Sequence, residues 1–324
     1  MACRKGLLPV ATFGTYLKKR FGERVRKIPV GLSGFTCPNI DGTVAKGGCT
    51  FCLNESFSPN LAQNAGKTFL NLQSRENPIL HKQLSELHEQ VIRTRKRFQR
   101  EEGVGKFLVY FQAFTNTYAP FETLKALYDR ALKYEGVVGL SIGTRSDSVT
   151  DETLEYLAEL SRTHEIWIEY GIQSIYDETL RRINRGHDAL NVEEAIKKAK
   201  SYGLNVCGHL IFGLPGETKT MMLDSARAAY DWGIDSVKYH PLYVVKQTLL
   251  AHEFKRGEFT PITREEYLEV LVEAIRLKPE RITVQRMTAG IQDDTLLAPD
   301  WCGESKNTQM QAIREALAEA GLCI

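Results

Sequence analysis

The chain has 324 residues, of which 43% are hydrophobic and 25% are charged, and its formal net charge is +2. This composition is typical of an ordinary globular protein that is large enough for one barrel-sized domain. A charge so close to balance excludes a global electrostatic field that would attract nucleic acid, but a balanced total is compatible with a local basic patch.

Two further features bear on where the protein works. The first residues, MACRKGLLPVATFG, contain no apolar stretch long enough for a secretory signal, and no apolar run approaches the ~20 residues of a membrane-spanning helix. The seven cysteines are an odd number in a chain without an export signal, which favours metal binding or catalysis over a disulfide framework. We therefore expect a cytoplasmic, reduced protein with no membrane partner.

Short apolar runs alternate with helical patterns along most of the chain. Such near-continuous runs are typical of parallel strands that are covered on both faces. The predicted strands are 27–33, 106–112, 137–143, 166–172, 205–212 and 235–243, with 281–286 as a candidate seventh.

Helical periodicity fills the segments between these strands. A helix is predicted over 150–163, where Thr150 precedes an acidic first turn, and another over 191–203 with Asn191 as its N-cap. A longer helix is predicted over 77–101. Strand–helix alternation repeated about six times predicts a parallel α/β barrel, complete or partial.

Two segments interrupt this rhythm. The polar, turn-rich segment 57–76 predicts a long loop after the first strand. From about residue 250 the alternation weakens, so we expect a core over 1–250 and a C-terminal extension over 251–324 that packs on it.

A cysteine-rich loop, GFTCPNIDGTVAKGGCTFC, follows directly on the first predicted strand. Eleven residues separate Cys37 from Cys49, and two separate Cys49 from Cys52. Three thiolates suit a [4Fe–4S] cluster in which one iron lacks a protein ligand, since a fully ligated cluster takes four cysteines. The open iron can chelate the amino and carboxylate groups of S-adenosylmethionine (SAM). A structural zinc with a fourth ligand from His81, Cys207 or elsewhere in the chain is the alternative.

Polar residues and glycines follow two of the later strands. WIEYGIQS places Glu169 and Gln173 at a strand end, and Arg185 lies in the turn beyond it. These side chains can hold ribose hydroxyls and a carboxylate. In HLIFGLPGET, Gly213 lets the backbone approach a flat ligand, although a plain turn that opens a helix is the alternative.

The cysteine loop, YFQAFTNTYAP, SIGTRSDSV, IEYGIQS, the NRGHD turn and HLIFGLPGET together resemble the YhcC/YtqA family. That family is a branch of the radical SAM superfamily, close to the elongator catalytic subunit and to the oxygen-independent coproporphyrinogen oxidases. The likeness runs from about residue 16 to 301. It implies a partial (βα)6 barrel of the TIM type, with a [4Fe–4S] cluster and SAM across its strand ends.

The resemblance also implies roles for individual residues. The segment 112–117 stands where related enzymes have a Gly-Gly-Glu motif for the SAM amino group, so Gln112 and Asn116 are expected there in its place. Phe51 resembles the aromatic residue that packs beside the adenine. The expected cluster ligands are Cys37, Cys49 and Cys52, and the expected SAM contacts are Phe51, Gln112, Asn116, Glu169, Gln173, Arg185, Ile211 and Gly213.

Members of this branch are implicated in modifying the wobble uridine of tRNA, and one proposed role converts a carboxymethylaminomethyl group at C5 to aminomethyl. We therefore expect tRNA and an electron donor such as flavodoxin or ferredoxin as partners. Two basic runs are candidate phosphate contacts: 18–20 with Arg24, Arg26 and Lys27, and 93–97 with Arg100. A solvated helix face is the alternative for each. Aromatic candidates for stacking a base are Tyr118, Tyr170, Tyr239 and Tyr243.

The substrate side of the site is represented by three candidates. Arg145 and Arg286 can each offer a guanidinium fork to a substrate carboxylate. His209 stands where the oxidases carry an aspartate and elongator-like members have histidine, and a structural role is its alternative. Two other functions stay open: a radical SAM enzyme for a small carboxylated molecule, and a non-catalytic, zinc-stabilised binding protein.

Overall fold

The structure is a computed structural model that describes residues 6–53, 70, 72 and 76–324. The predicted loop 57–76 lies largely outside the described residues. Within the described part of the chain, no helix combines the length and the apolar character needed to cross a bilayer.

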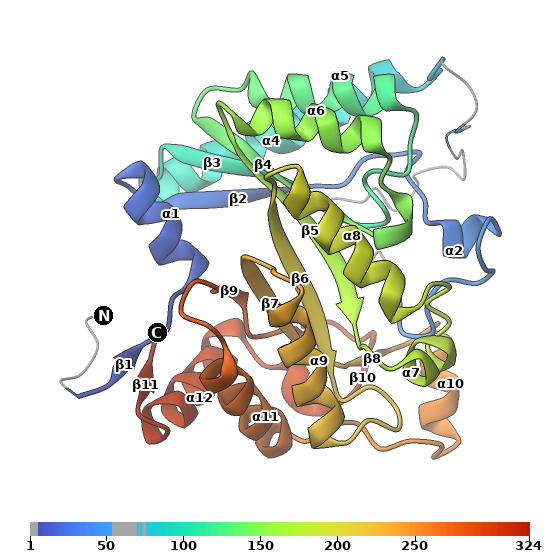
Figure 1. The fold of residues 1–324 in the computed structure, drawn as a ribbon, viewed down its shortest axis with the longest axis vertical. Helices are drawn as coiled ribbons and strands as arrows, with labels where there is room; N and C mark the ends of the chain where they lie inside the picture. The colour runs from blue at the N-terminus through green and yellow to red at the C-terminus, as the bar shows by residue number, and fades with distance from the viewer. Residues whose placement is uncertain (1–5, 54–69, 71, 73–75) are drawn as a thin grey trace.

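Seven parallel strands form one curled sheet in the order β2-β3-β4-β5-β6-β7-β9 (Figure 1). The sheet is an open half-barrel, so the α/β fold with a partial barrel is confirmed, and the candidate seventh strand is present. The strands are β2 (Val25–Val30), β3 (Lys106–Phe111), β4 (Val137–Thr144), β5 (Glu165–Gln173), β6 (Asn205–Phe212), β7 (Ser236–Pro241) and β9 (Thr283–Arg286).

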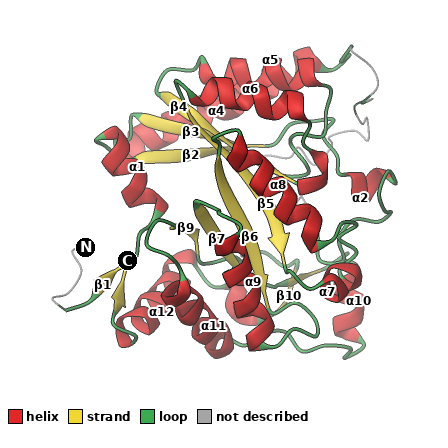
Figure 2. Ribbon diagram, in the orientation of Figure 1, coloured by secondary structure: helices red, strands yellow, loops and turns green. Residues whose placement is uncertain are grey.

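Helices surround this sheet, most of them on its outer face (Figure 2). They are α1 (Phe13–Phe21), α2 (Pro38–Asp41), α4 (Leu80–Glu102), α5 (Phe121–Leu132), α6 (Asp151–Ser161), α7 (Asp177–Arg182), α8 (Ala189–Ser201), α9 (Lys219–Asp231), α10 (Leu249–Lys255), α11 (Arg264–Leu277) and α12 (Lys306–Glu319). Short 3-10 turns are η1 (Ser146–Ser148) and η2 (Asp300–Gly303). Two small pairs complete the fold: β1 (Leu8–Pro9) with β11 (Leu322–Cys323), which brings the two chain ends together, and β8 (Val244–Val245) with β10 (Leu296–Ala298).

The N-caps test two of the helix predictions. Thr150 caps α6 as predicted, and its side chain accepts a hydrogen bond from the Thr153 backbone N–H. The prediction that Asn191 caps its helix is wrong. Asp188 is the cap of α8, because its extended backbone lets its carboxylate accept from the Asn191 N–H at 2.9 Å. The helix therefore starts two residues earlier than predicted.

Side chains alternate between the two faces of each strand, as the pleat requires. Along β5, the outward residues are apolar and pack in the main core beneath the helices: Ile166, Ile168, Tyr170 and Ile172. The residues between them are Trp167, Glu169, Gly171 and Gln173. The outer face thus provides the core, and the inner face is free to build a site.

The inner face is layered from one end of the half-barrel to the other. At the amino ends of the strands an apolar cluster contains Phe13 and Leu17 of α1 with Trp167 of β5. Helix α1 contacts both β2 and β9, so it bridges the first and last strands of the open sheet. It closes that end of the half-barrel, and the carboxyl ends of the strands are left for a cavity.

Candidate functional site

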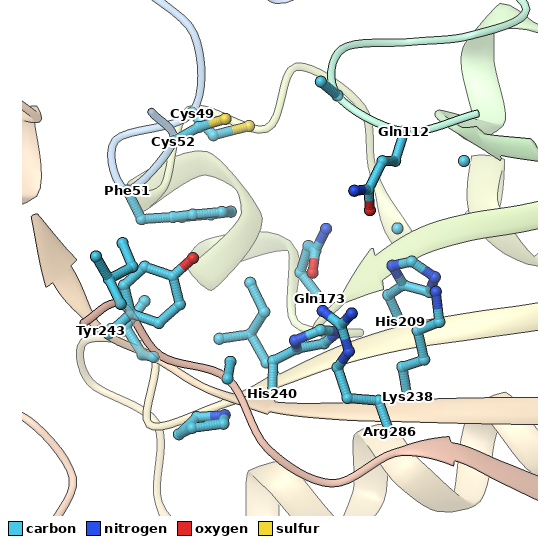
Figure 3. A pocket seen from close by; sticks show the side chains of 18 of the residues that line it. Cys49, Phe51, Cys52, Gln112, Gln173, His209, Lys238, His240, Tyr243 and Arg286 are labelled. Carbon is cyan, nitrogen blue, oxygen red and sulfur yellow. The ribbon is translucent and has the colours of Figure 1, made fainter. Parts of the chain in front are cut away.

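A cavity of about 940 Å³ lies inside the half-barrel at the carboxyl ends of its strands. Active sites of parallel barrels assemble at this end because the loops that follow the strands meet there. The cysteine loop lies on one side of the cavity, and residues of β6, β7 and β9 lie on the other, as Figure 3 shows.

The cysteine loop is fixed by the turn that follows α7. Asn184 has a positive φ of 53°, and its side-chain amide donates to the backbone oxygens of Lys46 (2.9 Å) and Gly48 (2.7 Å). Gly186 also has a positive φ, and a Cβ there would lie 2.3 Å from Asn39 Oδ1. This turn therefore needs its Asn and Gly to hold the loop against the barrel.

The thiols of this loop face polar donors. Cys49 Sγ accepts long hydrogen bonds from Asn39 Nδ2 at 3.6 Å and from Arg185 Nη1 at 3.8 Å. Cys49 is buried, whereas Cys37 and Cys52 are half-buried, and all three line the cavity. N–H donors to sulfur are a feature of iron–sulfur sites, where they adjust the reduction potential. The donor set and its surroundings fit a cluster bound by these three cysteines.

Three non-glycine residues on the cavity wall have strained backbones. Ala113 and Phe114, just beyond β3, have φ values of 69° and 58°, and Gln173, at the end of β5, has a φ of 68°. Each such residue costs of order 1–3 kcal/mol and persists where the surrounding structure enforces it, most often at functional sites. The strain lies where the predicted SAM contacts lie.

A charged layer separates the cavity from the apolar cluster near α1. Glu169 is fully buried and pairs with Lys27 (2.6 Å), Lys238 and His209 (2.8 Å). Lys238 also donates to Tyr110 Oη at 3.0 Å. A buried carboxylate is tolerated only when it is paired and fully hydrogen-bonded, and these groups satisfy both of its oxygens.

Burial and these neighbours shift the pKa values in the layer. The pKa of Glu169 is well below its usual value despite burial, because Lys238 and Lys27 stabilise the carboxylate. Burial lowers the pKa of Lys27 to about 8 and, together with Lys238, lowers the pKa of His209 to about 4. At neutral pH His209 is therefore a neutral imidazole beside an ionised Glu169.

The zinc alternative gains no support from the described residues. Among them, one group of three His, Cys, Asp or Glu residues has its ligand atoms within 4.8 Å of one another. It consists of Glu169, Cys207 and His209 and contains no residue of the cysteine loop. Burial raises the pKa of Cys207 to about 12, and two lysines already neutralise Glu169. His81, the other candidate ligand, is exposed on α4.

The wall across from the cysteines is cationic. Arg286 lies beside Lys238 in the register of β9 and β7, and His240 lies two residues farther along β7. Lys306 opens α12 and lines the same cavity. The side chains of Arg286 and Lys306 form no hydrogen bond or ion pair with any residue that the structure describes.

Most of the predicted site residues meet at this cavity. Those that line it are Cys37, Cys49, Phe51, Cys52, Gln112, Arg145, Glu169, Gln173, Arg185, His209, Ile211 and Arg286. Asn116 and Gly213 do not line it. The Asn116 side-chain amide instead donates to the backbone oxygens of Ala113 (2.9 Å) and Gly143 (3.0 Å) and so braces the loop after β3.

Some of the predicted aromatic and arginine candidates line the cavity, whereas others are buried in the core or already paired. Tyr243 lines the cavity, but Tyr170 and Tyr239 are 1% and 0% exposed in the outer core, so the expectation that they stack a base is wrong. Their strand positions point away from the barrel interior. Arg145 is engaged by Asp147 through two hydrogen bonds of 2.9 and 2.6 Å, although its Nη1 is buried without a partner.

Sequence reasoning missed Tyr110, Lys238, His240 and Lys306 as cavity residues. A signal existed for two of them. Lys238 and His240 stand two residues apart in an otherwise apolar strand, and this spacing puts both on one face of the strand. Lys306 carries no such signal, since it lies more than 60 residues away at the start of a helix.

The family comparisons agree with this geometry. Residues 42–229 match the profile described as the Radical SAM superfamily, and residues 234–319 match that of the Radical_SAM C-terminal domain. The protein YhcC of Escherichia coli K12 is 36% identical over 97% of this chain and 94% of its own length. The uncharacterized protein YtqA of Bacillus subtilis is 33% identical over 96% of this chain and 90% of its own length.

More distant relatives share part of the chain. A tRNA uridine(34) acetyltransferase of Methanocaldococcus infernus is 34% identical over 48% of this chain and 29% of its own length. Among solved structures, the archaeal Methanocaldococcus infernus Elp3 superposes with a TM-score of 0.59 at 20% identity. That likeness covers 92% of this chain and 64% of the other, and it shows the shared fold.

Proposed function

The chain belongs to the radical SAM superfamily, because the family profile matches more than half of its length. On this basis we propose that it is an enzyme that modifies the wobble uridine of tRNA. The proposed reaction converts a carboxymethylaminomethyl side chain at C5 to aminomethyl by breaking the bond between its nitrogen and the carboxymethyl carbon. Water enters and the two-carbon fragment leaves as glyoxylate, with SAM as the oxidant that ends as methionine and 5′-deoxyadenosine. The family implies a [4Fe–4S] cluster and SAM as its cofactors. When bound, they supply a 5′-deoxyadenosyl radical that abstracts hydrogen from an unactivated carbon.

The observation that carries the radical SAM chemistry of this proposal is the cysteine loop on the rim of the cavity. Cys37, Cys49 and Cys52 would hold the cluster, and Arg185 would fix the position of Cys49 while it donates to the Gly171 oxygen at 2.8 Å. Gln173, held at a positive φ, would orient the polar end of SAM. Phe51 would pack beside the adenine, with Ile211 nearby on the same cavity wall.

Support for tRNA as the substrate comes from the partial relatives. The acetyltransferases that match about half of this chain are named for uridine 34 of tRNA, and this shared half contains radical SAM sequence. The remaining parts of those longer proteins have no counterpart in the match. We infer that a tRNA substrate and an external electron donor, such as flavodoxin or ferredoxin, accompany the shared chemistry.

The division of the chain belongs to the same proposal. A core over 1–250 would carry the cluster and SAM, and the extension over 251–324 would shape the substrate side. The extension supplies β9 to the half-barrel and Lys306 to the cavity, so it is placed to contact whatever reacts there.

The first experiment tests the cofactor site. Protein reconstituted under anaerobic conditions should contain iron and sulfide and should form 5′-deoxyadenosine from SAM and a reductant. Cys49→Ala should lose both properties. Cys302→Ala is the matched control, because Cys302 is buried outside the cysteine loop and should keep both. Retention of iron and cleavage by Cys49→Ala would contradict the assignment.

The second experiment tests the substrate. Nucleosides of tRNA from a deletion strain should show more carboxymethylaminomethyluridine and less aminomethyluridine than those of the parent strain. The wild-type gene should restore the profile, and the Cys49→Ala gene should not. An unchanged profile would overturn the tRNA assignment and favour a small carboxylated substrate.

A further inference from the structure

Two cations of the cavity wall, Arg286 and Lys306, form no ion pair with any residue that the structure describes. Three acidic residues line the cavity, and none of them forms an ion pair with Arg286 or Lys306. Glu169 is held by Lys27, Lys238 and His209, Glu304 is paired with Arg264, and Asp293 accepts two hydrogen bonds from Thr295. Arg286 and Lys306 are thus left facing the cavity without a neutralising partner.

Arg286 and Lys306 repel each other electrostatically, and an anionic ligand would offset this repulsion. The positive charge of Arg286 helps to lower the pKa values of Lys306 and His240, although burial is the larger cause for both. Both side chains are exposed to the solvent of the cavity, so water screens their repulsion, but the charge of each still acts on the other. An anion that contacts both cations would remove this like-charge interaction.

The arrangement also suits an anion in its geometry. An arginine fork can donate two parallel hydrogen bonds to a carboxylate or a phosphoryl group, and lysine adds a compact charge. Lys306 is the first residue of the 14-residue helix α12, so the positive end of that helix dipole lies at the same place. His240 is neutral, because its pKa lies well below its ordinary value, and it can offer a further hydrogen bond.

Arg145, the other arginine candidate, faces a different part of the cavity. Its guanidinium lies in the field of Cys37 and Cys49 and is already paired with Asp147. Arg286 instead lies with His209, Lys238 and His240, across from Cys49 and Cys52 (Figure 3). The two arginines therefore serve opposite ends, and Arg286 faces the end away from the cluster ligands.

We propose that Arg286 and Lys306 form a subsite that binds an anionic oxygen group of the substrate, a carboxylate or a phosphate, and so orient the reacting carbon. This inference rests on the proposed function and assigns the residues that select its substrate. Arg286 contributes from β9 and Lys306 from α12, so the subsite exists only when the C-terminal extension packs on the half-barrel.

The test measures binding by the anaerobically reconstituted enzyme, with calorimetry as the readout. The probes are uridine, 5-aminomethyluridine, 5-carboxymethylaminomethyluridine and uridine 5′-monophosphate. The wild type should bind one anionic probe at least about tenfold more tightly than the probe that lacks the anion, as expected for charge-assisted hydrogen bonds. Arg286→Gln should abolish that preference, and Lys306→Gln should reduce it.

Arg314→Gln is the matched control, because Arg314 is exposed on the same helix and its loss changes the net charge equally. It should keep the wild-type preference. Arg286→Lys keeps the charge but loses the fork, so its preference should be intermediate.

The outcomes separate the two anions and the two proposals. A preference for the carboxylated nucleoside that needs Arg286 supports a carboxylate, and one for the monophosphate supports a phosphate. No preference in the wild type, or one that survives both substitutions, overturns the subsite. The tRNA profile of the deletion strain could be unchanged while the enzyme still shows an Arg286-dependent preference. That result would overturn tRNA as the substrate but support the anion subsite.

Discussion

The buried carboxylate of Glu169 gives the sharpest test of the charged layer. In Glu169→Gln the neutral amide keeps the shape of the side chain but leaves Lys27 and Lys238 without their counter-charge. Each unit-charge pair contributes about 4 kcal/mol at a charge separation of about 4 Å and an effective dielectric constant of about 20. Desolvation offsets part of this attraction, and breaking a buried pair typically costs about 3–5 kcal/mol. We expect a loss of about 4 kcal/mol.

This loss converts into a thermal shift. With about 2.1 cal/mol/K of unfolding entropy per residue, a chain of 324 residues has an unfolding entropy of about 0.7 kcal/mol/K. A loss of about 4 kcal/mol then lowers the melting temperature by about 6 °C. Calorimetry of the reconstituted protein at pH 7 measures it. Glu269→Gln is the control, because its ion pair with Lys219 is exposed and should contribute less than about 1 kcal/mol.

The same variant has a predicted pH dependence. Glu169 raises the pKa of Lys27, which burial lowers to about 8, so removing the carboxylate lowers that pKa further. Between this folded value and the unfolded value of about 10.4, the unfolded chain binds more protons, and stability rises with pH. The difference in melting temperature between the wild type and Glu169→Gln should therefore become smaller from pH 7 to pH 9. A melting temperature within about 1.5 °C of the wild type at pH 7, or a difference that grows with pH, would refute the reasoning.

Two further predictions concern the ends of the strands. Burial raises the pKa of Glu217 to about 7, and its Oε2 is buried without a partner while Oε1 accepts from Ser174, so its ionised form is destabilising. Because that pKa is raised, the folded state binds more protons than the unfolded chain between about pH 4.5 and 7, and the protein loses stability as pH rises through this range. Glu217→Gln should therefore raise the melting temperature at pH 8 but not at pH 5. An equal rise at both pH values would contradict this cause. In Gly171→Ala the new Cβ would lie 2.5 Å from Gln173 Nε2 and 2.7 Å from Arg185 Nη2, so SAM affinity in equilibrium dialysis should fall by about tenfold, and wild-type affinity would refute these contacts.

The local sequence determined the strands and the cysteine loop of this protein. Near-continuous apolar runs are typical of strands covered on both faces, and all seven runs lie in the sheet. The spacing of Cys37, Cys49 and Cys52 sets the donor chemistry, since thiolates so close in sequence can reach one metal group. The turn around Asn184 and Arg185 was also recognisable from the sequence, because its polar residues and glycine follow β5 and α7.

The tertiary structure alone decided which charges meet and which stay free. Lys27 and Lys238 are more than 200 residues apart, yet both reach Glu169 because β2 and β7 curl toward each other around the half-barrel. The local sequence pattern of a strand carries no information about such pairings, because it does not depend on which residue lies across the half-barrel. Arg286 and Lys306 face the cavity without a counter-charge only because the extension folds back over the half-barrel.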